Sequence, residues 1–166
     1  MYSCEDDMYP DVRNWLEHEL KSKFHEATLT RAYITSRMSL TKLLESEGLT
    51  RYFSAEYLTY DIMVDVTGVI VIDSRGELIL VECKLHKITL RDLSQLLGYS
   101  IVARPLYSLI ISPEGASDSL RTLIESFGRE DILEYMPGRK IAIARWNAWK
   151  KDIDYMNIIP RGWSFR

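Results

Sequence analysis

The stretch Met63–Leu85, MVDVTGVIVIDSRGELILVECKL, decides the fold. Its first half is rich in valine and isoleucine, which favour β-strands. Asp73-Ser74-Arg75-Gly76 has the composition of a turn, and a second apolar run follows it. The pattern therefore predicts a β-hairpin with one strand over Met63–Ile72 and the other over Glu77–Leu85.

The second strand of this hairpin ends in charged residues. Side chains alternate between the two faces of a strand. One face carries Leu78, Leu80, Glu82 and Lys84, and the other carries Ile79, Val81, Cys83 and Leu85. A strand that is apolar at its start and charged at its end on one face predicts a cleft at the charged end.

The turn determines which residues lie opposite each other in the hairpin. If Ser74 and Arg75 are its two central residues, Asp65 lies opposite Lys84 and on the same face as Glu82. A loop of odd length would instead separate Asp65 from Glu82. A shared site for the two carboxylates therefore requires an even-length loop or a compensating β-bulge.

Asp65, Glu82 and Lys84 are residue types that suit metal-assisted phosphodiester hydrolysis. Two carboxylates a few ångströms apart suit Mg²⁺, with Mn²⁺ as a substitute, because hard cations prefer oxygen ligands. Such a metal ion activates water and neutralises charge, and a lysine can orient the water. The alternative is a salt-bridged cluster on the sheet rim, since short D…ExK patterns also arise by chance.

The remaining chain predicts a mixed α/β fold with helices on the faces of a central sheet. At 166 residues it suits a single domain, 1–166. Thr89 and Asp92 form a capping-box pattern at one helix start. Helices are expected over Pro10–His25, Ser36–Glu47, Thr89–Ala103 and Asp118–Phe127, and further strands over Tyr52–Tyr60, Tyr107–Ser112 and Lys140–Trp146.

The hairpin and the helix after it resemble the PD-(D/E)xK nuclease superfamily, which includes restriction enzymes, archaeal Holliday junction resolvases and RecB-type exonucleases. The resemblance covers most of the chain and implies a restriction-endonuclease-like mixed central sheet flanked by helices. It implies Asp65, Glu82 and the backbone carbonyl of Cys83 as metal ligands, and Lys84 as the catalytic lysine. Val64 departs from the proline in the family's name.

Two helices carry further matches to the family. Gln95 and Tyr99 resemble the QxxxY motif of the RecB-like branch, and a helix places them on one face with Arg91. The resemblance implies that Gln95 is catalytic and that Tyr99 and Arg91 contact DNA. On the first helix, Glu17 resembles a glutamate that completes a metal position, and Glu19 is the alternative.

Basic and aromatic residues are candidates for contact with nucleic acid. His86 and Lys87 follow the charged strand and could touch phosphate, although ordinary loop residues are the alternative. The whole chain has a net charge of −3, but segment 138–166 carries seven basic residues against two acidic ones. Four aromatic residues are interleaved there, which suits nucleic acid. The alternative is a solvated tail with core aromatics, and the residues concerned are Trp146, Trp149, Trp163 and Phe165.

The sequence thus predicts a Mg²⁺-dependent deoxyribonuclease of the RecB-like kind, with DNA as its partner. One alternative is a structure-selective Holliday junction resolvase, which would act as a homodimer. Another is a catalytically silent nucleic-acid-binding or assembly module with the same fold. Two distant cysteines, Cys4 and Cys83, argue against an iron–sulfur cluster. No apolar run is long enough for a membrane span, and the polar N-terminus predicts a cytoplasmic protein, or one in the host cytoplasm if viral.

Overall fold

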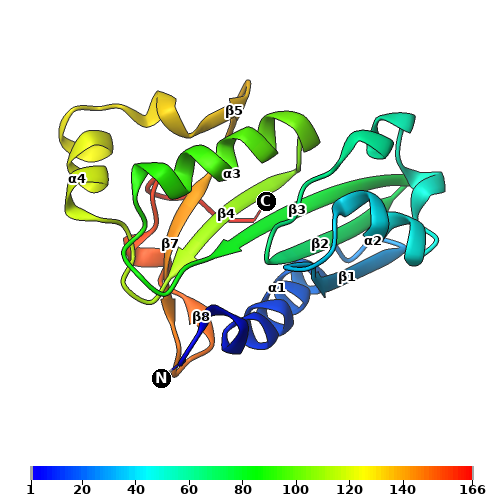
Figure 1. Cartoon of the computed structure of the whole chain (residues 1–166), viewed down its shortest axis with the longest axis horizontal. Helices are drawn as coiled ribbons and strands as arrows, with labels where there is room; N and C mark the ends of the chain where they lie inside the picture. The colour runs from blue at the N-terminus through cyan, green and yellow to red at the C-terminus, as the bar shows by residue number, and fades with distance from the viewer. Residues whose placement is uncertain (1, 166) are drawn as a thin grey trace.

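The computed structural model describes residues 2–165, and within them six strands form one mixed sheet in the order β1-β2-β3-β4-β7-β8 (Figure 1). The first three strands are antiparallel, β3, β4 and β7 are parallel, and β8 is an antiparallel edge strand. The predicted mixed α/β class is therefore confirmed. The strands are β1 (Leu29–Ile34), β2 (Val66–Ile72), β3 (Arg75–Cys83), β4 (Tyr107–Ser112), β7 (Ala142–Asn147) and β8 (Asp152–Ile153).

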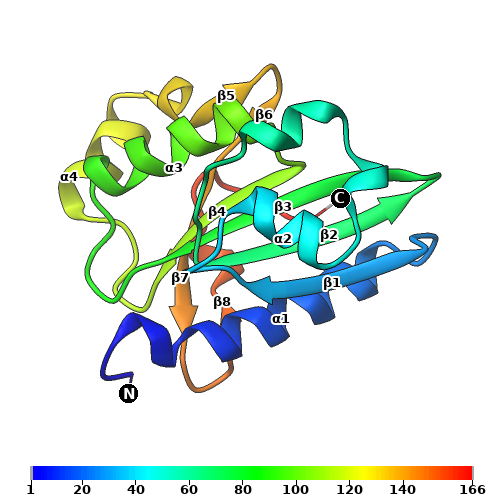
Figure 2. The same ribbon diagram turned by 45° about the vertical axis from the view of Figure 1, so that its right-hand side comes forward.

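Helices cover both faces of the sheet. Figure 2 shows α1 on one side and α2 and α3 on the other. A separate two-stranded sheet pairs β5 with β6 beside α3. No helix within residues 2–165 has both the length and the apolar composition needed to cross a lipid bilayer. The bounds are α1 (Tyr9–Lys23), α2 (Leu40–Ser46), α3 (Leu90–Ala103), α4 (Asp118–Arg121), β5 (Glu134–Met136) and β6 (Arg139–Lys140).

Strand alternation builds two separate hydrophobic cores. Ile79, Val81 and Cys83 of β3 face α1, where they pack among its buried side chains. Leu78 and Leu80 face the opposite way, into the core beneath α2 and α3. Each strand in the centre of the sheet is therefore apolar on both faces, as expected for a sheet covered on both sides.

The β2–β3 hairpin turns at Asp73 and Ser74, because Ile72 pairs with Arg75. Both turn residues have positive φ, 48° and 63°, as a two-residue type I′ turn requires. The prediction that Ser74 and Arg75 are the central residues is wrong by one position. The loop nevertheless has an even length, so the two strands keep the faces that the sequence predicted.

Gly68 in β2 allows α1 to lie close to the sheet. A Cβ atom at this position would come 2.8 Å from Leu20 Cδ1 and 3.2 Å from Leu16 Cδ2, both on α1. It would also come 3.2 Å from Ile79 Cβ on the neighbouring strand. The absence of a side chain therefore sets the height of the helix above the hairpin.

The other elements agree with the sequence in part. The strands predicted at Tyr107–Ser112 and Lys140–Trp146 and the helices at Pro10–His25 and Thr89–Ala103 are confirmed, with shifted ends except in β4. The predicted strand Tyr52–Tyr60 is wrong, since 3₁₀ turns occupy Thr50–Tyr52 and Ala55–Thr59. The predicted helices Ser36–Glu47 and Asp118–Phe127 are shorter α-helices, and the second continues as a π-helical turn over Thr122–Ser126.

Candidate active site

Asp65 and Glu82 lie at the open end of the hairpin, opposite the turn. Val66 pairs with Val81, so the two carboxylates occupy the next position along the antiparallel pair. This corrects the predicted register, in which Asp65 faced Lys84. Both side chains are buried, and the residues are only 9% and 5% exposed. Asp65 Oδ2 accepts a hydrogen bond of 2.8 Å from the backbone N–H of Cys83, which fixes it beside the end of β3.

Lys84 joins the carboxylates from the residue just after β3. Its Nζ atom donates to Glu82 Oε1 at 2.7 Å, and only 14% of its side chain is exposed. Its backbone N–H donates to Ile111 O at 2.9 Å, which holds the residue against β4. The structure thus brings together the three residues of the predicted motif: Lys84 is paired with Glu82, and its charge lowers the pKa of Asp65 against the effect of burial.

The electrostatics of this cluster favour the binding of positive charge. Burial and the negative charge of Asp65 raise the pKa of Glu82 to about 7, against the lowering effect of Lys84. Burial also raises the pKa of Asp65, although the Cys83 N–H bond opposes it. Burial lowers the pKa of Lys84, but the hydrogen bond and charge of Glu82 outweigh it and leave that pKa raised. A cation would relieve the repulsion between the carboxylates.

The N-terminal segment supplies site residues that the sequence analysis missed. Tyr9, the first residue of α1, lies close to Asp65, and its side chain contributes to lowering the pKa of that carboxyl against the effect of burial. Glu5 and Asp6 belong to a 3₁₀ turn, Glu5–Asp7, that precedes this helix. The charge of Glu5 raises the pKa of Glu82, and the charge of Asp6 raises that of Asp65. The run of acidic residues just before a helix was the available sequence signal.

Glu17 lies apart from the pair, in contrast to its predicted place in the metal site. Its Oε2 atom accepts from the Ala32 N–H at 3.1 Å, and its other oxygen pairs with Lys21. It also lies about 12 Å along the helix axis from Tyr9, since each helical residue rises 1.5 Å. The alternative, Glu19, accepts from the Tyr155 hydroxyl at 3.0 Å. Both glutamates serve contacts between α1 and its neighbours.

The α3 residues of the QxxxY pattern face each other as the helical spacing predicted. Gln95 Nε2 lies 3.5 Å from the Tyr99 hydroxyl, at the outer limit of a hydrogen bond. Gln95 and Arg91 are exposed. Asp92, at the start of the same helix, lies near enough to the cluster for the charge of Lys84 to contribute to lowering its pKa. The structure therefore joins Gln95 to Tyr99 and leaves their role at the site a prediction.

His86 and Lys87 lie in the exposed loop between Lys84 and α3. His86 Nδ1 lies 2.9 Å from Lys87 O, and the Lys87 Nζ atom lies 3.2 Å from Asp118 Oδ2. The carbonyl of His86 accepts a 2.7 Å bond from Ser112 Oγ, which ties the loop to the end of β4. Both residues follow Lys84 closely in the sequence, and their side chains are exposed to solvent. Their contact with phosphate stays a prediction.

The donor atoms of the cluster suit a hard divalent cation. Among residues 2–165 no three His, Cys, Asp or Glu side chains converge into a metal site made of protein side chains alone. Mg²⁺, however, usually takes only one or two carboxylates and keeps several waters. The Cys83 carbonyl leaves β3 on the same side as its N–H, towards Asp65, and adds an oxygen donor. Asp65, Glu82 and this carbonyl therefore fit a magnesium ion.

Cys83 separates this site from the core under α1. Its thiol is fully buried, and burial raises its pKa, which suppresses the reactive thiolate. Cys4 is the other free cysteine, and it is exposed on the N-terminal segment. The Cys83 side chain therefore packs as an apolar group while its backbone faces the carboxylates.

No family model matches the sequence, and neither a curated protein nor a solved structure matches it significantly. What the cluster does must therefore be inferred from its own geometry and charge.

Proposed function

We propose that this protein is a metal-dependent nuclease that hydrolyses DNA phosphodiester bonds, with a restriction-endonuclease-like fold. The observation that carries the proposal is the buried cluster of Asp65, Glu82 and Lys84 at the open end of the hairpin. The order α1, β2–β3 hairpin, α3 and parallel β4 supports it, because the PD-(D/E)xK resemblance implies that same order.

Burial of these charges needs an explanation beyond folding. Taking carboxylates out of water costs several kcal/mol per ion in proteins, and one lysine cannot neutralise two of them. When both carboxylates are ionised the cluster carries one excess negative charge, and Glu5 and Asp6 add to it from the N-terminal turn. A bound divalent cation would offset this negative charge, as in a metal-dependent enzyme.

Each residue then has a role that follows from its contacts. Asp65, Glu82 and the Cys83 carbonyl would hold Mg²⁺ or Mn²⁺, which supplies charge neutralisation and a water of lowered pKa when bound. The Cys83 N–H orients Asp65, and the Tyr9 side chain lies beside it. Lys84 spends one N–H on Glu82 and keeps two for a water or a phosphate oxygen.

Glu5 takes the role in this proposal that was predicted for Glu17 from the sequence. It is partly exposed on the N-terminal turn, and its charge is felt at both Glu82 and Lys84. A carboxylate that reaches the site from solvent can bind a metal-coordinated water without being a direct ligand.

A cleavage assay with labelled linear duplex, single-stranded and four-way-junction DNA tests the proposal. It compares Mg²⁺, Mn²⁺ and EDTA. Cleavage should need the metal and be lost in Lys84→Met and Glu82→Gln, with thermal melting verifying that each variant is folded. Glu5→Gln should reduce the rate, whereas Glu17→Gln, the matched change on the helix, should leave it unaltered.

The outcomes separate the rival functions. Preference for the four-way junction, together with a two-fold dimer in solution, would favour the resolvase. Metal-independent DNA binding without cleavage would favour a silent binding module. Full cleavage by folded Lys84→Met would contradict the proposed mechanism.

A further inference from the structure

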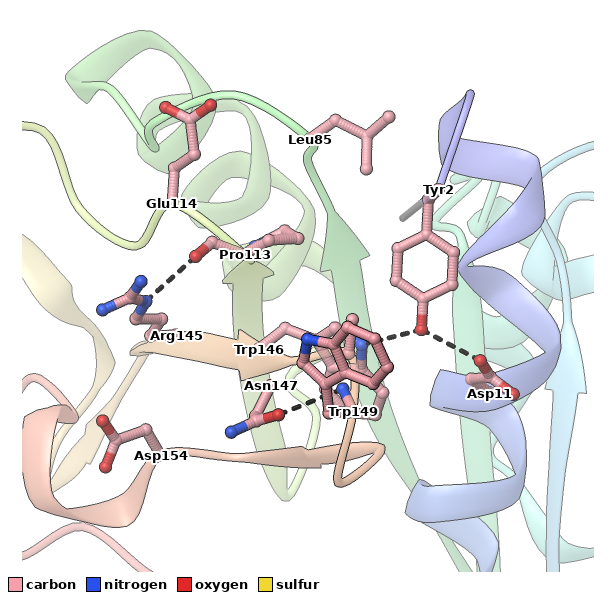
Figure 3. Close-up of a pocket in the computed structure, with 11 residues that line it drawn as sticks. Tyr2, Asp11, Leu85, Pro113, Glu114, Arg145, Trp146, Asn147, Trp149 and Asp154 are labelled. Atoms are coloured by element: carbon pink, nitrogen blue, oxygen red, sulfur yellow. Dashed lines mark hydrogen bonds between the residues drawn. The ribbon is translucent and has the colours of Figure 1, made fainter.

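A hollow of about 950 Å³ opens at the carboxyl ends of β3, β4 and β7 (Figure 3). Tyr2, Leu85 and Trp146 pack with the core around α1, so this part of the lining is on the opposite face of β3 from Glu82 and Lys84. Its lining begins at Leu85, the residue that follows Lys84. Trp146 and Pro113 are apolar residues of its lining, which also includes Glu114, Arg145 and Trp149. Arg145 is two strands from β3, so it lies roughly 10 Å from the backbone of Lys84.

The walls of the hollow are fixed by hydrogen bonds. On one side the Tyr2 hydroxyl accepts from Trp146 Nε1 at 3.0 Å and donates to Asp11 Oδ2 at 2.9 Å (Figure 3). On the other side Arg145 Nε donates to Pro113 O at 3.0 Å. The space is therefore preformed, which lowers the entropy cost of binding a ligand there.

Trp149 differs from the other aromatic residues of the C-terminal segment. Trp146 and Phe165 are each 2% exposed, and Trp163 packs against the core around α1. Trp149 is 97% exposed at the tip of the β7–β8 hairpin. Core packing thus accounts for the first three aromatics, as one of the two interpretations of this segment expected, but not for Trp149.

The tip that carries Trp149 has a defined backbone. The N–H groups of Trp149 and Lys150 both donate to Asn147 Oδ1, at 3.1 and 3.0 Å. Asn147 ends β7, so the bonds tie the tip to the sheet. A fully exposed indole on a fixed turn presents a π-face to solvent, which is the feature of proteins that stack unpaired bases.

The charges around the hollow select a neutral group for its interior. Glu114, Asp11 and Asp154 place carboxylates on the lining, which disfavours a phosphate inside. Asp11 is paired with Lys151 at 2.8 Å, and Asp154 accepts from Met156 N–H and Asn157 Nδ2. Lys150 is exposed beside Trp149 and offers a cation outside the hollow. A nucleobase inside and its phosphate outside would match this distribution.

We propose that part of the hollow holds one unpaired nucleobase of a DNA strand, stacked on Trp149, and that the strand continues past the carboxyl end of β3 to the phosphodiester bond at the cluster. The inference rests on the proposed nuclease function and deepens it by naming the substrate class, DNA with unpaired nucleotides near the cleavage point. Arg145 and Lys150 then contact the phosphates that flank the base, and Glu114 accepts from an exocyclic amino group.

The test is a double-mutant cycle of binding affinities, in which Trp149 is changed in the protein and single bases are removed from the DNA. Fluorescence anisotropy in EDTA, where cleavage is absent, measures the affinity for a labelled single-stranded oligonucleotide and for a set with one abasic position each. We expect Trp149→Ala to weaken binding about tenfold, and Trp149→Phe to retain most of it. The matched control is Phe127→Ala, which removes another exposed aromatic, 73% exposed, from the segment after α4.

The abasic set makes the result specific to one nucleotide. In one oligonucleotide of the set, the abasic position should remove the stacked base and weaken binding to the wild-type protein about as much as Trp149→Ala does. The same abasic position should not weaken binding to Trp149→Ala any further. An abasic penalty that persists in this variant, or equal affinity of the variant and the wild type, would overturn the inference. Because the assay measures binding without metal, a defect in cleavage cannot produce either result. If cleavage were observed but binding did not depend on Trp149, only the proposed base site would be contradicted, and the proposed nuclease function would stand.

Discussion

The two ends of the β2–β3 hairpin differ in what they bury. At the turn end, Asp73, Ser74 and Arg75 are exposed, and the Phe53 ring lies over Gly76. At the open end, Asp65 and Glu82 are buried with a largely buried Lys84. The turn end follows ordinary folding rules, whereas the open end breaks the rule that charges stay in water. We therefore expect changes at the turn end to alter stability and changes at the open end to alter activity.

The largest expected effect is at the open end. Asp65→Asn keeps an acceptor for the Cys83 N–H and the side-chain volume, but it removes one of two like charges. Cleavage should fall about a hundredfold or more, because a metal ligand is weakened. The free energy of unfolding without metal should not fall by more than about 1 kcal/mol, because the repulsion on Glu82 is removed.

Rate measurements and urea unfolding on the same Asp65→Asn preparation check this expectation. If the variant were strongly destabilised, and its loss of activity matched the fraction of unfolded protein, the open end would stabilise the fold as the turn end does.

The second effect is at the turn end. In Gly76→Ala the added Cβ would lie 2.4 Å from two atoms of the Phe53 ring, so the ring must move. Overpacking of this kind costs about 1–3 kcal/mol of unfolding free energy. Urea unfolding measures the loss, and the cleavage rate per folded molecule should match the wild type. A stable Gly76→Ala protein with reduced cleavage would reverse the proposed division between the two ends.

A smaller effect is expected in the middle of the hairpin. Gly68→Ala also creates a clash, but the nearest atom, at 2.8 Å, is the end of the Leu20 side chain, which can shift. We expect a loss of about 1 kcal/mol, near the lower limit for overpacking. Thermal melting of Gly68→Ala and Gly76→Ala under the same conditions ranks their losses of stability. A larger loss at Gly68 would mean that α1 cannot move away from the sheet.

The smallest effect should be a gain. Ser74 has a φ of 63°, which glycine adopts without the steric cost that serine bears. Ser74→Gly, giving the favoured Asp-Gly turn, should therefore raise the free energy of unfolding by up to about 1 kcal/mol. Thermal melting checks the sign, and an unchanged cleavage rate is expected. A decrease in stability would show that the loss of chain entropy at glycine outweighs the relief of strain.

The sequence predicted the hairpin because its two strands are continuous runs of apolar residues. It missed β1, since Ala32 is the only buried residue between Leu29 and Ile34 and the hydrophobic signal is weak. It misassigned Tyr52–Tyr60 because aromatics favour strands, whereas here they pack from 3₁₀ turns against the core beneath α2 and α3.

The part of the candidate site that depends on the alternation and pairing of strands was predicted from the sequence. Asp65 and Glu82 share one end of the hairpin because the parity of the loop was right, although the pairing was displaced. Glu5, Asp6 and Tyr9 were missed because their approach depends on how α1 lies across the sheet, which no local spacing encodes. Tertiary packing likewise decides that Glu17 binds the backbone of β1.

The difference between the two cysteines makes the protein suitable for site-specific labelling. A maleimide dye should react with exposed Cys4 and spare Cys83, whose thiol is fully buried and has a raised pKa. The dye would then sit one residue from Glu5, beside the carboxylate cluster. Its emission would report the arrival of a metal ion or a DNA strand in the unmutated protein.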